Sequence, residues 1–136
     1  MGLQEKRAIA GFRENQFVNL VNELNTVAGY EPEIEVSWDT LGVEGYGDLY
    51  NEGFTKVYFE PLINALKEIA VDALGKEALK GTVKKVIIKN EGNFGSGKSA
   101  YSFSDGVLTI DHSPITNINE VAERTKYLAQ FLSSKM

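Results

Sequence analysis

The segment Gly92–Ser99 holds the one motif in this 136-residue sequence that has a defined chemical use. It reads Gly-Asn-Phe-Gly-Ser-Gly-Lys-Ser and fits the phosphate-loop pattern G-x-x-x-x-G-K-[ST]. In such a loop, backbone N–H groups surround phosphate oxygens and the lysine reaches the outer phosphates. The segment also follows an expected strand, Val83–Lys89. A working loop of this kind would make the chain a nucleotide-binding protein.

A phosphate loop must open directly into a helix, whose N-terminal dipole and free N–H groups complete the anion site. The residues after Ser99 instead predict the strands Ala100–Ser104 and Val107–Asp111, joined by a type I′ turn at Asp105-Gly106. We therefore interpret Asn90–Lys98 as an exposed, glycine-rich hairpin loop between two antiparallel strands. An alternative hypothesis is that the loop binds an anion without nucleotide chemistry, through Gly95, Gly97, Lys98 and Ser99.

His112 is the only histidine, and it stands between Asp111 and Ser113, which are the residue types of a hydrolase triad. Adjacent strand residues point to opposite faces, so these three neighbours cannot form a triad with one another. No G-x-S-x-G elbow supplies a nucleophilic serine elsewhere in the sequence. With one histidine, no cysteine and no acidic spacing of the EF-hand type, we expect no metal and no cofactor.

Aromatic and acidic residues in the first half of the chain could line a ligand pocket. Trp38-Asp39 ends an expected strand, and Glu60 precedes Pro61 beside a run of aromatic residues. That run, Tyr46, Tyr50, Phe54 and Tyr58, repeats every four residues, which is typical of the core face of a helix and can also line a ligand groove. The candidate ligand-binding residues are Trp38, Asp39, Tyr50, Phe54, Tyr58, Glu60 and His112.

Composition and charge narrow the classes of function. The chain is 43% hydrophobic and 24% charged, as expected for one ordered globular domain over residues 1–136. A net charge of -5 repels the nucleic-acid backbone, and no cluster of Lys and Arg offsets it. The absence of cysteine excludes disulfides and thiol catalysis. Without a signal peptide or an apolar run of about 20 residues, we expect a cytoplasmic protein that does not enter membranes.

Hydrophobic spacing predicts the elements that position these residues. One long amphipathic helix is expected over residues 3–28, and strict alternation over Pro32–Trp38 predicts a half-buried strand. Helical spacing returns from Tyr46, and Pro61 should kink that helix or start a new one. The last helix is expected to begin near Asn117, with Glu120 three residues later as a near capping box.

The resulting order is helix, strand, two helices, three strands and helix. It predicts an α+β domain whose helices pack on one face of a four-stranded, mostly antiparallel sheet. If the first two strands are neighbours, Glu33 and Glu35 could face Lys85 and Lys89 on the open surface.

These features favour a non-catalytic protein-interaction or binding module. Its partner would be another protein or a second copy, bound through the long N-terminal helix, and neither nucleic acid nor a membrane. The alternative is a small-molecule-binding protein or small enzyme that uses an aromatic-lined pocket between sheet and helices. A third possibility is anion or nucleotide binding by the loop Gly92–Ser99.

Overall fold

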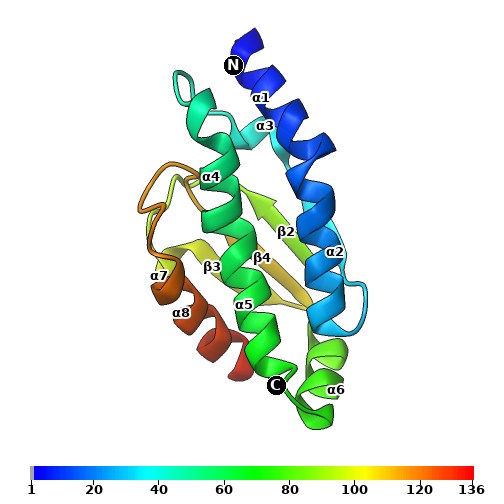
Figure 1. Ribbon diagram of the computed structural model, residues 1–136. Coiled ribbons are helices and arrows are strands. Elements are labelled where there is room, and N and C mark those ends of the chain that lie inside the picture. Colours follow the sequence, from blue (N-terminus) through cyan, green and yellow to red (C-terminus); the bar gives the residue numbers. More distant parts are fainter. Residues whose placement is uncertain (1) are drawn as a thin grey trace.

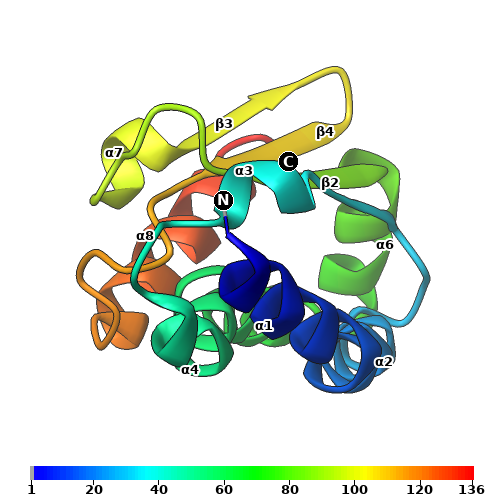
Figure 2. The ribbon, with the colours of Figure 1, turned by 90° about the horizontal axis from the view of Figure 1, so that it is seen from above.

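Four short strands form one sheet, and helices cover a single face of it (Figure 1 and Figure 2). The computed structural model describes residues 2–136. The strands are β1 (Glu33–Val36), β2 (Lys85–Lys89), β3 (Tyr101–Ser104) and β4 (Val107–Asp111). Their order in the sheet is β1-β2-β4-β3.

Eight α-helices contribute to the second layer and to the ends of the sheet. They are α1 (Leu3–Glu14), α2 (Gln16–Ala28), α3 (Trp38–Leu41), α4 (Tyr50–Phe54), α5 (Glu60–Ile69), α6 (Ala73–Thr82), α7 (Gly97–Ala100) and α8 (Val121–Ser133) within residues 2–136. A 3-10 turn, Gly47–Leu49, precedes α4, and a π-helical turn, Thr55–Phe59, joins α4 to α5 into one rod (Figure 1). None of the helices in residues 2–136 has the length and apolar composition that crossing a bilayer requires.

The predicted α+β class and the packing of helices on one face are confirmed, but the expectation of a mostly antiparallel sheet is wrong. β1 runs parallel to β2, and β2 runs parallel to β4, so only the β3–β4 pair is antiparallel. Alternation of apolar and polar residues indicates burial on one face, and it does not fix strand direction. Because three strands are parallel, β1, β2 and β4 end at the same side of the sheet, which we call the C-terminal edge.

The hairpin of β3 and β4 is confirmed in turn type and register. Asp105 and Gly106 have φ angles of 51° and 80°, as a type I′ turn requires. Tyr101 pairs with Ile110 and Phe103 with Leu108, as predicted.

The charge pairing across the open face is confirmed for one of the two lysines. Lys85 Nζ lies 2.9 Å from Glu33 and 3.2 Å from Glu35. Lys89 instead pairs with Glu91 at 2.5 Å. β1 and β2 are therefore neighbours, as this prediction assumed.

Several predicted element boundaries are wrong. The N-terminal helix breaks at Asn15, whose side-chain amide donates to the Gly11 carbonyl and so competes with the helical backbone. Strand β1 ends at Val36, and Trp38 opens α3. Asn117 is not a helix cap, because it adopts φ 52° and its side chain donates to the Gly95 carbonyl.

Aromatic rings fill the core between the helices. Phe12 meets Phe54 edge-on at 5.1 Å, and Tyr50 stacks on Phe54 at 4.8 Å. Tyr50, Phe54 and Tyr58 are at most 1% exposed. The aromatic repeat from Tyr50 to Tyr58 is therefore the core face of the α4–α5 rod.

Candidate functional site

Three chain segments with sequence-predicted site residues meet at the C-terminal edge of the sheet. Trp38 and Asp39 follow β1, the glycine-rich loop follows β2, and His112 follows β4. In open sheets of parallel strands, ligands bind at this edge. Two hydrogen bonds tie the segments together, from the Asn90 N–H to Thr40 Oγ1 (3.0 Å) and from the Ser113 N–H to the Phe94 carbonyl (2.8 Å).

The glycine-rich loop already binds a carboxylate of its own chain. Asp111 Oδ1 accepts hydrogen bonds from the backbone N–H groups of Glu91 (2.8 Å) and Gly92 (3.0 Å). Gly92 is the first residue of the phosphate-loop match, and Glu91 directly precedes it. Lys98 is exposed, and a single four-residue turn, α7, follows Ser96.

The loop differs from the sequence interpretation in two respects. It is not a hairpin loop, because β4 lies between β2 and β3 and the chain must cross the end of β4. The segment after the loop does not enter a strand at Ala100, because α7 comes first.

The glycines of the loop have packing roles. A Cβ added at Gly95 would lie 2.7 Å from Thr116 Cγ2, and one at Gly97 would lie 3.0 Å from Tyr127 Cδ1. Both distances are shorter than side chains accept without displacement. Because glycine has no Cβ, the loop can pack closely against the segment before α8 and against α8 itself.

A buried polar cluster lies beneath this loop, centred on His112 and Arg124, which are 0% and 4% exposed. The Tyr58 hydroxyl donates to the His112 carbonyl at 2.5 Å. Arg124 donates from Nη2 to the carbonyls of Thr116 (3.1 Å) and Asn117. The cluster thereby fixes the irregular segment between β4 and α8.

Burial shifts the ionisation of each group in the cluster. Burial lowers the pKa of His112 below its ordinary 6.5 and outweighs the hydrogen bond to the Ser113 carbonyl, which raises it, while the Arg124 charge lowers it further. Burial also lowers the pKa of the Arg124 guanidinium from its ordinary value. It raises the pKa of Tyr101 to about 12 and that of Tyr58 well above the ordinary value. The cluster is therefore neutral except for Arg124.

Sequence reasoning missed Arg124. It lies four and eight residues before Leu128 and Leu132, on the stripe that α8 buries. A charged residue at a position that the helical repeat predicts to be buried is the signal from which Arg124 could have been identified. Of the four residues of the anion hypothesis, Lys98 and Ser99 are exposed, and Gly95 and Gly97 are half-buried.

Trp38 and Asp39 line a cleft of about 500 Å³ between α1 and α3. The Arg13 guanidinium lies over the half-buried Trp38 indole, 5.6 Å from the ring centre. Phe17 meets the same indole edge-on at 5.0 Å. The other wall residues on α1 are Lys6, Ile9, Ala10 and Glu14.

The other candidate residues of the alternative hypothesis, a ligand pocket lined by aromatic side chains, do not line this cleft. Glu60 borders a separate hollow of about 250 Å³ between α2 and α5. Tyr50, Phe54 and Tyr58 face the core because the α4–α5 rod packs against α1, α2 and α8. His112 is also fully buried, in the polar cluster.

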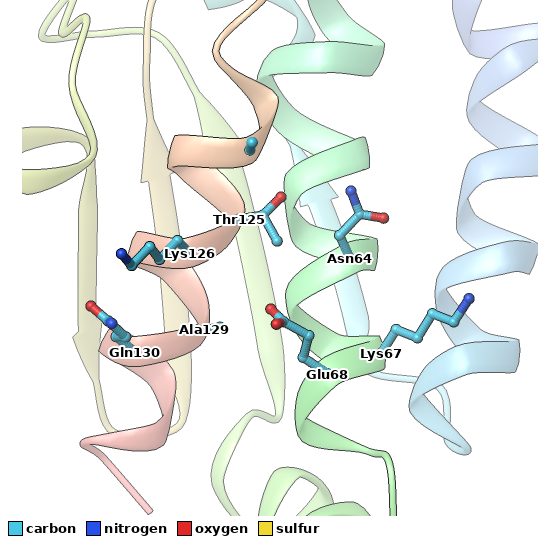
Figure 3. A pocket seen from close by; sticks show the side chains of 8 residues that line it. Asn64, Lys67, Glu68, Thr125, Lys126, Ala129 and Gln130 are labelled. Atoms are coloured by element: carbon cyan, nitrogen blue, oxygen red, sulfur yellow. The ribbon is translucent and has the colours of Figure 1, made fainter.

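A wider groove of about 790 Å³ runs between α5 and α8 (Figure 3). Glu68 of α5 reaches toward α8, whereas Lys67 points away from it (Figure 3). The Thr125 hydroxyl oxygen on this wall is buried and has no hydrogen-bond partner within residues 2–136. The groove lacks an aromatic side chain, and the sequence did not predict it.

Comparisons of the chain with known protein families, with curated proteins and with solved structures find no match.

Proposed function

We propose that this protein is a non-catalytic binding module of the cytoplasm that binds a protein partner in the cleft between α1 and α3. The observation that carries the proposal is Trp38, a half-buried indole that lines this cleft beneath the Arg13 guanidinium. Trp and Arg are enriched among the residues that dominate binding energy at protein interfaces. The cysteine-free sequence is compatible with a reducing compartment.

Charged side chains of both signs surround the indole. Lys6 and Arg13 stand on the α1 wall, and Asp39 lies on the α3 side. A hydrophobic anchor with a charged rim is the usual composition of a protein interface. A partner that inserts an apolar side chain against Trp38 and presents both an acidic and a basic group would match this cleft.

The placement of α1 supports the same proposal. Figure 1 shows α1 extending beyond the C-terminal edge of the sheet. A second hollow of about 280 Å³ lies on its other side, between α1 and the turn that precedes α4. Leu3, in the first turn of α1, is 61% exposed. A partner or a second copy of the chain can therefore contact α1 from both sides.

A small-molecule ligand is the second candidate, because the cleft volume of about 500 Å³ lies within the usual range of roughly 300–1,000 Å³ for ligand sites. Under this alternative, Trp38 would stack on the ligand and Arg13 or Asp39 would orient it.

Site-specific photocrosslinking tests for a protein partner. A photoreactive benzoylphenylalanine replaces Ala10, which is exposed on the cleft wall, and a matched control replaces Lys80, which is exposed on α6. We expect a defined adduct from position 10 that Arg13→Glu abolishes, and no such adduct from position 80. Equal crosslinking from both positions would contradict a specific interface at the cleft.

Fluorescence distinguishes the two ligand classes, because Trp38 is the only tryptophan. A saturable change in its emission on titration with metabolite mixtures, abolished by Arg13→Ala, would favour a small molecule. Sedimentation velocity tests whether the partner is a second copy of the chain, in which case a dimer forms that Trp38→Ala dissociates. If crosslinking, titration and sedimentation all give no signal that depends on Arg13 or Trp38, the proposal fails.

A further inference from the structure

The groove between α5 and α8 is separate from the Trp38 cleft, because the two share no lining residue. Its α8 wall holds three short side chains, Ala122, Thr125 and Ala129, which are spaced by three and four residues and so lie on one side of the helix. Packed helix axes lie about 8–10 Å apart, depending on the side chains between them, and short side chains favour the closer distance. The groove can therefore accept a further helix.

Opposite charges stand on the two walls of the groove. Glu68 lies on α5 and Lys126 lies on α8, and both side chains are exposed. Neither belongs to an ion pair within residues 2–136. Figure 3 shows Glu68 reaching toward α8, whereas Lys126 extends from α8 away from α5. A surface that presents the reverse order of charges would be complementary to this one.

The polar side chains of the groove have an order that a second copy of the chain presents in reverse. In Figure 3, Lys126 and Glu68 lie diagonally across the groove, and Asn64 and Gln130 lie across the other diagonal. A two-fold axis normal to the groove exchanges its two walls and reverses the direction of both helices. It therefore brings Lys126 of each copy to Glu68 of the other, and Gln130 of each copy to Asn64 of the other. Self-complementarity of this kind is what a two-fold contact requires.

We propose that two copies of this chain associate through the groove, with the short side chains of α8 in each copy entering the groove of the other. Each of the two pairings occurs twice in this dimer. Glu68 and Lys126 balance each other, so the contact does not add to the repulsion between two chains that each carry a net charge of -5. The third charged residue of the groove, Lys67, points away from α8 (Figure 3).

The contact uses no residue of the Trp38 cleft, so this inference does not rest on the function proposed for that cleft. A dimer formed in this way would carry two Trp38 clefts. A partner with two matching segments would then bind the dimer with added avidity.

Sedimentation equilibrium of the full chain tests the proposal with two charge reversals. Glu68→Lys and Lys126→Glu each replace two attractive contacts of the dimer by two repulsive ones, so each alone should raise the dissociation constant at least about tenfold. In an equimolar mixture of the two variants, the two lysines of one face the two carboxylates of the other, so a dimer should form again. Glu77→Lys and Lys80→Glu, at exposed positions on α6, change the net charge by the same amounts and should leave the dissociation constant within about twofold of the wild type.

The mixture also shows that both variants are folded, because an unfolded chain could not restore the dimer. A wild type that remains monomeric at about 0.1 mM would overturn the proposal. A wild-type dimer that neither reversal weakens, or a mixture that stays monomeric, would do the same. A dimer that Trp38→Ala dissociates and Glu68→Lys leaves intact would place the contact at the cleft between α1 and α3 instead.

Discussion

Arg124 Nε donates a hydrogen bond to His112 Nε2 across 3.4 Å, inside a cluster that buries both side chains. A guanidinium can only donate, so Nε2 of the imidazole must be unprotonated. The single ring proton is therefore on Nδ1, which donates to the Ser113 carbonyl at 2.7 Å. Both ring nitrogens are engaged in the neutral form, and a second proton would face the Arg124 cation directly.

This arrangement predicts that acid destabilises the fold through His112. Its pKa is lowered by burial, and by the Arg124 charge, from about 6.5 in the unfolded chain. Between the two pKa values the unfolded chain binds a proton that the folded chain does not. The free energy of unfolding should therefore fall as the pH drops below about 6.5, by at most about 1.4 kcal/mol per pH unit from this group.

Urea unfolding of the wild type and of His112→Gln, followed from about pH 8 to pH 5, measures this effect. The glutamine oxygen can accept from Arg124 but does not titrate. We expect a flatter pH dependence in the variant. The same slope in both proteins would show that His112 does not contribute.

Phe12→Ala should destabilise the protein by about 3–5 kcal/mol. Phe12 is 0% exposed and contacts the rings of Phe54 and Trp38, so its removal leaves a cavity in the aromatic core. Denaturant unfolding followed by Trp38 fluorescence measures the loss. Val18→Ala, at a site that is 49% exposed, is the control and should cost less than about 1 kcal/mol. A small effect of Phe12→Ala would mean that α1 packs only loosely.

Two glycine-to-alanine changes should have opposite signs. Gly106→Ala should destabilise by roughly 1–2 kcal/mol, because Gly106 has φ 80° in the β3–β4 turn. Gly11→Ala should stabilise by roughly 0.5–1 kcal/mol, because Gly11 is helical and no atom of residues 2–136 with which it could clash lies within 4 Å of an added Cβ. Thermal unfolding of both variants provides the comparison. A stabilising effect of Gly106→Ala would contradict the type I′ turn.

The glycine-rich loop should depend on Asp111 and not on Lys98. Asp111→Ala removes the acceptor for the Glu91 and Gly92 N–H groups and should cost roughly 1.5–3 kcal/mol. Lys98→Ala, at an exposed position, should stay within about 0.5 kcal/mol of the wild type. Thermal unfolding measures the stability of both variants, and its repetition with ATP and magnesium tests for nucleotide binding. If ATP and magnesium stabilise the protein and Lys98→Ala abolishes this effect, the loop binds nucleotide and our interpretation of it is wrong.

Local features of the fold were predictable because their causes are local. Asp105-Gly106 determines the turn type, and the apolar residues on either side of it determine the register of β3 and β4. The helical repeat of Tyr50, Phe54 and Tyr58 identified a core face for the same reason.

Strand direction was not predictable in this way, because β2 pairs with two strands that are distant in the sequence. The alternating pattern of β1 favoured an antiparallel sheet, but it arises because helices cover one face only. The parallel arrangement is what brings Trp38, the glycine-rich loop and His112 to one edge. The sequence did not single out Arg124, because charged residues on helices are usually exposed to solvent. Its burial depends on hydrogen bonds to backbone carbonyls between β4 and α8, where no hydrophobic repeat predicts the conformation.

The order of the strands also bears on how the protein avoids aggregation. The two outermost strands, β1 and β3, are only four residues long. β1 presents the exposed carboxylates Glu33 and Glu35, and β3 presents the exposed hydroxyls of Ser102 and Ser104. Short, polar outer strands are poor templates for a strand from another molecule. The length and polarity of these two strands therefore disfavour edge-to-edge polymerisation of the sheet.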